Sequence, residues 1–194
     1  RALETAYAQA ETPVVSNNSA FRMAEDVPMM IPEINSEHMA VIEAQRRRLG
    51  TKVGFVTCKP NCSIQGYVPA LEPLRSFGLE KVMVATYQAI SGAGKTFRSW
   101  PEMVDNVIPF IGGEEHKSEV EPLKIWGRVE DGRIVMAEKP VISAQCYRVA
   151  ASDGHMAAVS VSFREKPTRD EILARWAAYE GLPQKYRLPS APEK

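Results

Sequence analysis

Apolar residues in the first 57 positions recur in some stretches at helical spacing and in others at strand-like spacing. They indicate helices at 2–10 and about 36–49, and short strands at 14–16, 29–31 and 53–57. Helices that alternate with strands are typical of an α/β layer with a parallel sheet. Residues 1–57 are therefore expected to form such a layer.

The pattern continues through a Lys-Pro-Asn turn into a helix. Asn61 is a good N-cap and would place Cys62 at the first helical position. Apolar residues then recur at helical spacing, so this helix is expected to pack against a core with its first turn facing outward. They are Ile64, Tyr67, Val68, Leu71, Leu74 and Phe77.

Further along, the pattern predicts a strand at 81–90 and helices at about 101–111 and 114–126. A capping box of Thr168 and Glu171 predicts a last helix from 169 to about 179. Alternating strands at 141–151 and 155–163 flank an Asp-Gly pair, which is a strong hairpin signal. In such a hairpin Arg148 would lie roughly 13 Å from the turn, and its side chain would have to reach back toward His155.

Composition narrows the function classes. The 194 residues are 44% hydrophobic and carry 24 basic and 24 acidic side chains, which suits one or two soluble domains. Zero formal net charge and the lack of a basic run argue against nucleic acid or an anionic membrane as the main partner. Three cysteines, no signal peptide and no membrane-length apolar run make the cytoplasm the expected location. The start at Arg1 and the extended segment at 188–194 suggest a fragment of a longer protein.

Cys62 is the first candidate for chemistry. The N-terminus of a helix favours a thiolate over a thiol, so a cysteine at that position is a plausible nucleophile. A buried structural cysteine is an equally good interpretation of this segment alone. Cys58 and Cys62 lack a second pair of ligands, and no metal site is expected.

The loop Ser91-Gly92-Ala93-Gly94 continues into Lys95-Thr96 and nearly matches a phosphate-binding P-loop. A P-loop needs a helix directly behind the Lys-Thr pair, whereas Trp100-Pro101 delays the next expected helix start. An NTPase is therefore a remote alternative. Taken alone, Arg22 suits a solvated arginine, and Glu114 with Lys117 suits an ordinary ion pair along a helix.

Several motifs occur together and in order: Pro60-Asn61-Cys62-Ser63, Tyr87-Gln88 with Ser91 to Gly94, Asp105 to Phe110, Glu114 to Lys117, Arg148-Val149 and Gly154-His155. This set resembles the aspartate-semialdehyde dehydrogenase family in its archaeal and fungal branch. The resemblance implies an α/β fold, with an α+β catalytic domain whose mixed sheet is flanked by helices. Residues 1–60 would be the tail of a Rossmann-like NAD(P)-binding domain. Residues 61–194 would be a catalytic and dimerisation domain that is incomplete at its C-terminus.

The resemblance also implies roles. Cys62 would be the nucleophile that forms a thioacyl intermediate, His155 the general acid and base, and Gln88 the residue that orients the acyl group. Arg148 and Glu114 would bind the amino-acid substrate, and Arg22, Asn61 and Lys117 the phosphate. Ser91, Gly92, Ala93 and Gly94 would contact NADP. The reaction would convert aspartyl phosphate to aspartate semialdehyde in a homodimer or homotetramer.

Two departures from the family pattern leave alternatives open. Lys95-Thr96-Phe97 stands where the family commonly has Tyr-Pro-Gly, and no glycine-rich dinucleotide fingerprint is present. The chain alone is therefore expected to lack turnover. A malonyl-CoA reductase shares the thioester chemistry, although Asn61, Glu114, Lys117 and Arg148 favour the aminoacyl phosphate. A non-catalytic scaffold fragment is the alternative from another class.

Overall fold

A computed structural model describes residues 1–191, and their contacts divide into two compact units. The first unit contains residues 1–60, 121–138 and the described residues from Ala177 onward. The second contains residues 61–120 and 139–176. The first unit's opening segment ends at Pro60, and two later segments, 121–138 and 177–191, pack with it. Residues 192–194, part of the segment expected to be extended, lie outside the described residues.

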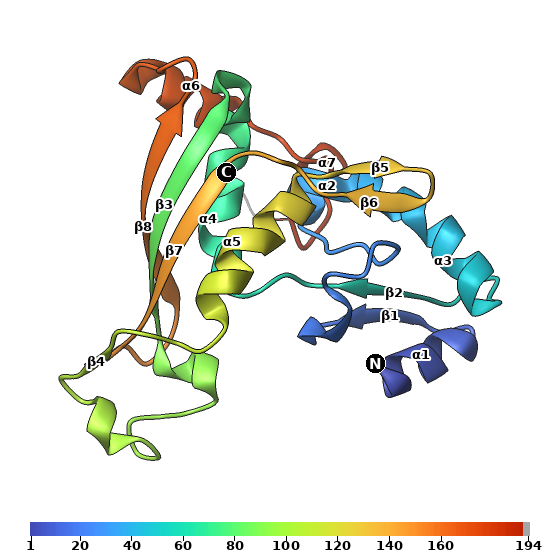
Figure 1. Ribbon diagram of the computed structural model, residues 1–194, viewed down its shortest axis with the longest axis horizontal. Helices are drawn as coiled ribbons and strands as arrows, with labels where there is room; N and C mark the ends of the chain where they lie inside the picture. The colour runs from blue at the N-terminus through green and yellow to red at the C-terminus, as the bar shows by residue number, and fades with distance from the viewer. Residues whose placement is uncertain (192–194) are drawn as a thin grey trace. The chain divides into compact units, whose positions relative to one another are not determined.

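The first unit is an α/β layer, as predicted (Figure 1). Helix α1 (Ala2–Gln9) is followed by β1 (Pro13–Ser16), which pairs in parallel with β2 (Phe55–Cys58). The expected strand at 29–31 is reduced to a single bridge between Met29 and Cys58. The helix expected at 36–49 is broken into α2 (Pro32–Asn35), a 3-10 helix (Ser36–Val41) and α3 (Ile42–Leu49).

A short hairpin of β5 (Arg128–Glu130) and β6 (Arg133–Val135) and a one-turn helix, α7 (Leu182–Lys185), complete the first unit. The sequence pattern does not indicate the hairpin. Its two-residue turn, Asp131 and Gly132, has both residues at positive φ, which is the geometry that two-residue hairpin loops require.

Lys124 stabilises the irregular segment after β1. The residue is 2% exposed, and its ammonium group donates to the carbonyl oxygens of Arg22, Ala24 and Val27 at 2.6, 2.6 and 2.8 Å. Burial lowers the pKa of this lysine to about 8. A buried cation with three carbonyl partners holds the loop where regular secondary structure is absent.

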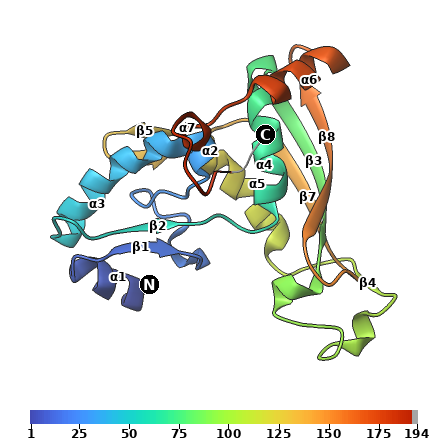
Figure 2. The ribbon, with the colours of Figure 1, turned by 180° about the vertical axis from the view of Figure 1, so that it is seen from behind.

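The second unit is built on a mixed sheet, which confirms the expected fold class (Figure 2). The strand order is β4 (Val107–Ile108), β7 (Val141–Val149), β3 (Leu79–Gln88) and β8 (His155–Phe163). β3 runs parallel to β7 and antiparallel to β8, while β4 pairs antiparallel with the end of β7.

The hairpin predicted from the Asp-Gly pair is wrong. β7 and β8 do not pair with each other because β3 lies between them. Their connection crosses the end of β3 and bonds to it: Ala151, Ser152 and Gly154 accept hydrogen bonds from the amides of residues 90, 91 and 89. The local turn signal is real, with Gly154 at φ 83°, but the partner of each strand is chosen by long-range packing.

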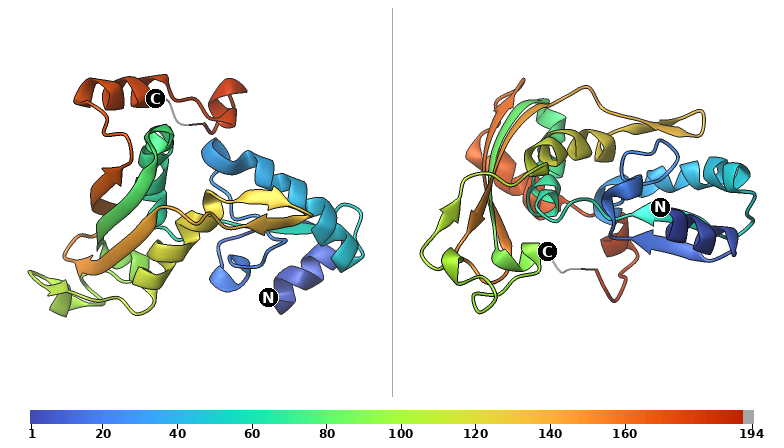
Figure 3. Two further views of the ribbon diagram at one scale, coloured as in Figure 1. Left: turned by 45° about the horizontal axis from the view of Figure 1, so that its top comes forward. Right: turned by 60° about the horizontal axis from the view of Figure 1, so that its bottom comes forward.

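Helices α4 (Ile64–Leu71) and α5 (Glu114–Ile125) lie over one face of this sheet, and the opposite face is bare (Figures 1 and 3). α5 also protects the edge of β7, since Glu119 and Glu115 accept hydrogen bonds from the amides of Ala144 and Cys146. α6 (Arg169–Ala178) begins at the predicted Thr168–Glu171 capping box, which is formed by reciprocal hydrogen bonds. Within residues 1–191 no helix combines the length and apolarity needed to cross a membrane.

The helix predicted at 101–111 is also wrong. Only a 3-10 turn (Pro101–Met103) forms, and the chain then passes through Asp105 at φ 54° into β4. Of the apolar residues whose spacing suggested a buried helix face, Met103 is buried, but Val104 and Val107 are more than half exposed. A residue in the left-handed region ends a helix, and β4 gains hydrogen bonds by pairing with β7 instead.

Replacing Lys124 by methionine should destabilise the first unit. The substitution keeps most of the aliphatic volume but leaves three carbonyls without their donor, so we expect a loss of roughly 2–4 kcal/mol in the free energy of unfolding. Urea denaturation at pH 7 measures it. Lys166→Met, at an exposed loop position, is the control, and equal stability of the two variants would contradict the assignment.

Candidate active site

Cys62 lies in the turn that leads from β2 to α4. The regular helix begins at Ile64, two residues later than predicted, with Ser63 as its N-cap residue. Asn61 still acts as a local cap, because its Oδ1 accepts from the backbone N and the Oγ of Ser63 at 2.9 and 2.8 Å. Asn61 and Ser63 are buried while Cys62 between them is exposed. The turn therefore presents the thiol to solvent.

The thiol of Cys62 faces an imidazole. Its Sγ lies 3.3 Å from Nε2 of His155, the first residue of β8. Two residues 93 positions apart in the sequence are thus within proton-transfer distance. The predicted nucleophile and the predicted general acid and base are brought together.

The other ring nitrogen of His155 has two backbone neighbours. Nδ1 lies 2.6 Å from the carbonyl oxygen of Gly154 and 3.2 Å from the amide N of Ala89. When Nδ1 carries a proton it donates to Gly154, and Nε2 can accept the proton of Cys62. When Nδ1 is bare it accepts from Ala89, and Nε2–H can donate to the sulfur. The backbone offers a partner to either tautomer.

Gln88, Arg148 and His155 form one row across three strands. In the register of the sheet, Gln88 at the end of β3 pairs with Arg148 of β7 on one side and with His155 of β8 on the other. Directly paired residues point to the same face, here the face covered by α4 and α5. Arg148 does not need to reach back along a hairpin, because its strand neighbour is Gln88.

Arg148 is buried at 7% exposure and donates from Nη1 to the carbonyl oxygen of Ala89 at 2.8 Å. Gln88 is 2% exposed, and its Nε2 lies 3.3 Å from Oγ1 of Thr86 and 3.4 Å from a carboxylate oxygen of Glu114. Both side chains are held by neighbours on the covered face, so their polar ends have defined positions.

Glu114, at the first position of α5, links three other predicted site residues. Its Oε2 accepts from Asn61 at 2.8 Å and from Gln88, and its Oε1 accepts from Lys117 at 2.7 Å. Burial raises the pKa of this carboxyl, but the hydrogen bonds from Lys117, Asn61 and Gln88 outweigh it and the net shift is downward. Glu114 is therefore a carboxylate at neutral pH, and the i, i+3 pair with Lys117 is part of a larger cluster.

Arg22 belongs to the first unit and has its own partners. Its guanidinium donates to Glu121 at 3.1 Å, in an ion pair of which both side chains are buried, and to the carbonyl oxygen of Asn17. The Arg22 Nε is buried without a hydrogen-bond partner among the described residues. The idea that it is a solvated surface arginine is wrong.

The glycine loop is not a P-loop. Residues Ile90–Ala93 form a 3-10 turn, Gly94 adopts a left-handed conformation at φ 66°, and no helix follows Lys95 and Thr96. The N-terminal helix dipole that a P-loop uses for phosphate is therefore missing at this loop. The loop is exposed, and its backbone borders Arg148 and His155.

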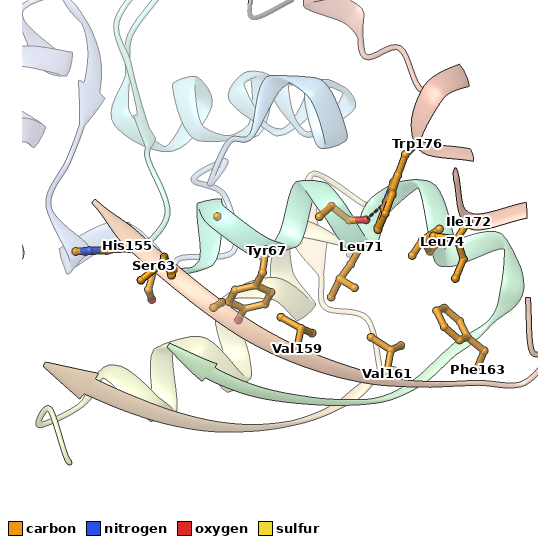
Figure 4. A pocket seen from close by; sticks show the side chains of 14 residues that line it. Ser63, Tyr67, Leu71, Leu74, His155, Val159, Val161, Phe163, Ile172 and Trp176 are labelled. Carbon is orange, nitrogen blue, oxygen red and sulfur yellow. Dashed lines mark hydrogen bonds between the residues drawn. The ribbon is translucent and has the colours of Figure 1, made fainter. Parts of the chain in front are cut away.

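A groove of about 740 Å³ opens beside the site within the second unit (Figure 4). Ser63 and His155 lie at one end of it, and apolar residues of α4 and β8 line its length up to Trp176. Trp176 donates from Nε1 to the carbonyl oxygen of Ala70. The site therefore has a polar end at the thiol and an apolar flank along the edge strand.

Sequence reasoning missed several groups that fix these positions. Ser63 and Thr86 are side-chain partners of Asn61 and Gln88, and the backbone at Ala89 and Gly154 holds His155. The Asn-x-Ser spacing of residues 61–63 is a recognisable turn signal and could have indicated the first contact. The backbone contacts depend on strand order, which no local signal carries.

These features define an α/β protein with an exposed thiol–imidazole pair at the end of a mixed sheet. Two protein-family models match this chain. Residues 71–189 match the dimerisation domain of semialdehyde dehydrogenases, and residues 1–42 match their NAD binding domain. The chain belongs to the semialdehyde dehydrogenase family.

Its relatives point to one branch of that family. The aspartate-semialdehyde dehydrogenase of Archaeoglobus fulgidus is 45% identical over all of this chain and 55% of its own length. The crystal structure of aspartate semialdehyde dehydrogenase with NADP from Candida albicans is 35% identical and superimposes with a TM-score of 0.84, covering 98% of this chain and 55% of that one. Aspartate semialdehyde dehydrogenase II of Vibrio cholerae, solved in complex with ASA, has a TM-score of 0.70 at 25% identity, covering 90% of this chain and 55% of that one. The chain thus spans about half the length of the relatives it matches.

Cys62 should be the most reactive of the three thiols. Burial raises the pKa of Cys58 to about 11 and raises that of Cys146, so both remain buried thiols at neutral pH, whereas Cys62 is exposed beside His155. Limiting iodoacetamide at pH 7, followed by peptide mapping, should label Cys62 first. Cys58 should gain reactivity only as the pH approaches its pKa of about 11, and labelling of Cys58 or Cys146 ahead of Cys62 would contradict the assignment.

Proposed function

We propose that this chain is the catalytic part of an aspartate-semialdehyde dehydrogenase that acts on L-4-aspartyl phosphate and L-aspartate 4-semialdehyde. The observation that carries the proposal is the 3.3 Å contact between Cys62 and His155, beside a row of Gln88 and Arg148. The family match and the substrate-complexed Vibrio relative support the substrate class. In this role the protein would serve the aspartate pathway to lysine, threonine and methionine.

Cys62 and His155 would carry the covalent steps. His155 takes the thiol proton as the Cys62 sulfur attacks the acyl carbon of aspartyl phosphate. The bond from that carbon to the phosphate oxygen breaks, the proton passes to the departing phosphate, and a thioester remains on the enzyme. After reduction of the thioester to a thiohemiacetal, His155 accepts its hydroxyl proton while the carbon–sulfur bond breaks and the semialdehyde departs. Gln88, fixed by Thr86 and Glu114, would orient the acyl group.

Arg148 and Glu114 would hold the amino-acid part of the substrate. A guanidinium offers a planar fork to an α-carboxylate, and a carboxylate is a suitable partner for an α-ammonium group. Both side chains are preorganised, Arg148 by Ala89 and Glu114 by its three donors. A malonyl-CoA reductase would have no ammonium group to pair with Glu114, so this cluster favours the aminoacyl substrate.

Arg22, Asn61 and Lys117 would bind phosphate. Lys117 is partly exposed and carries a point charge, and Asn61 lies next to Cys62 in sequence. The Nε of Arg22 supports a role in binding an anion, because it is a buried donor with no hydrogen-bond partner among the described residues. Glu121 would hold the guanidinium in place for this task.

NADP is the proposed cofactor, and the glycine loop fits it. Ser91, Gly92, Ala93 and Gly94 form an exposed loop with little side-chain volume beside the reactive pair, which permits close approach of a flat ring. When bound, NADPH would supply the hydride that reduces the thioester. The chain's own residues would bind the substrate, form the thioester and move the proton. Because no glycine-rich dinucleotide fingerprint is present, the chain alone should be inactive.

A second copy of the chain is the proposed partner, in a homodimer or homotetramer. The matched family model is a dimerisation domain and includes the whole sheet of the second unit. On the bare face of that sheet, Met83, Val141 and Met156 are more than half exposed, and small side chains line a shallow hollow between β7, β3 and β8. An uncovered sheet face with exposed apolar side chains suits a self-complementary interface.

In a complete enzyme that contains this chain, substitutions at these residues should affect phosphate and semialdehyde differently. Arg22→Ala and Lys117→Ala should weaken phosphate use roughly tenfold to a hundredfold, whereas Arg148→Ala should weaken semialdehyde binding by a similar factor, because each removes charge-assisted hydrogen bonds to one ligand. Steady-state kinetics of phosphate-dependent semialdehyde oxidation measures both KM values.

Glu121→Gln separates the loss of the ion pair from the loss of the guanidinium, since it breaks the same buried pair and keeps Arg22; it should weaken phosphate use less than Arg22→Ala. Equal loss of apparent affinity for both ligands in all three variants would contradict the division of roles. Full activity of Cys62→Ser would overturn the proposed function itself.

The dimer proposal predicts the effect of a charge on the bare face. Ala158→Arg places a guanidinium at the hollow and should weaken self-association roughly tenfold or more, because an unpaired charge must be desolvated in the interface. Ala10→Arg, at an exposed position in the first unit, should leave it unchanged. Sedimentation velocity over a concentration series tests this, and unchanged association of Ala158→Arg would exclude this face.

A further inference from the structure

Gly92 lies in the glycine loop against both Arg148 and His155, and its backbone conformation does not require a glycine. Unlike Gly94, it does not lie in the left-handed region of φ. Instead, neighbouring side chains crowd the position that a Cβ on residue 92 would occupy. A Cβ on Gly92 would lie 3.0 Å from Nη1 of Arg148 and 3.0 and 3.1 Å from Cε1 and Nε2 of His155.

Hydrogen bonds hold both neighbours in place. Arg148 is buried, and the same Nη1 donates to the carbonyl oxygen of Ala89. The imidazole of His155 is fixed through Nδ1 by Gly154 and Ala89. Its Nε2, which a new methyl group would press, is the atom in contact with the sulfur of Cys62. A displacement of a few tenths of an ångström would therefore fall on the reactive pair.

We infer that Gly92 is a positioning residue whose missing side chain lets the imidazole of His155 reach Cys62 while Arg148 stays seated beside it. This inference rests on the proposed function, and it adds a role that a cofactor contact alone does not give. Gly92 acts through His155 and Arg148, not through the cofactor. Its effect is therefore present in the chain with no cofactor bound.

The reactivity of Cys62 tests the inference without turnover. In Gly92→Ala, the rate of iodoacetamide labelling of Cys62 at pH 7 should fall about threefold to tenfold, and the midpoint of its pH profile should move upward, because the imidazole no longer assists the thiolate. Gly112→Ala is the matched control: a Cβ there meets nothing within 4 Å, and its φ is ordinary. It makes the same change to the unfolded chain and should label like the unsubstituted protein.

A double-mutant cycle identifies the route of the effect. If Gly92 acts through the imidazole, Gly92→Ala should have no further effect on Cys62 labelling in a His155→Ala background. An equal slowing in both backgrounds would overturn the inference, because it would mean a general change in the loop. Unchanged labelling in Gly92→Ala alone would also overturn it.

The failure of this inference can be told apart from failure of the proposed function. Unsubstituted Cys62 that labels no faster than Cys58 would count against the reactive pair itself. If Gly92→Ala does not fold, Gly92→Ala combined with Arg148→Ala removes one of the two opposing side chains but leaves the methyl group against His155, and it is compared with Arg148→Ala. Slower labelling in the double variant supports the inference, and equal labelling overturns it.

Discussion

The position of β3 between β7 and β8 is the constraint on which the site depends. Each of its neighbours is fixed to it by a full ladder of hydrogen bonds, one parallel and one antiparallel. Because both ladders meet at Gln88, the residues opposite it, Arg148 and His155, must lie at the same level and point to the same face. A shift of either register by one residue would turn a site residue to the bare face.

The covered face adds a second constraint, a half-buried carboxylate that needs hydrogen-bond donors. Glu114 enters from α5 and finds them in Asn61, Gln88 and Lys117, which come from the turn before α4, from the end of β3 and from its own helix. Removing a carboxylate from water is costly unless it is hydrogen-bonded, so these groups stabilise one another's positions. The turn that exposes Cys62 is thereby tied to the strand that ends beside His155.

The sequence predicted the elements whose signals are local. The capping box of α6, the span of α5 and the outward turn at Cys62 follow from caps and helical spacing, and the structure has them within two residues. The chemistry at Cys62 and His155 was predicted by resemblance, since no periodicity brings residues 93 positions apart together. The false hairpin and the false helix at 101–111 share a cause: in both, a strand partner distant in sequence outcompeted a valid local pattern.

The same preference for a distant strand partner over a local hairpin also brings the site residues together. A hairpin at Asp153-Gly154 would have satisfied β7 and β8 with each other and left β3 outside. With β3 inserted, the connecting loop must cross its end, and there the carbonyls of residues 151, 152 and 154 take up the amides of residues 90, 91 and 89. These bonds bring the glycine loop so close to Arg148 and His155 that a Cβ on Gly92 would lie about 3.0 Å from each of them. The crossing therefore sets the distance between the loop and the reactive pair, through a left-handed residue at Gly154 and a crowded position at Gly92.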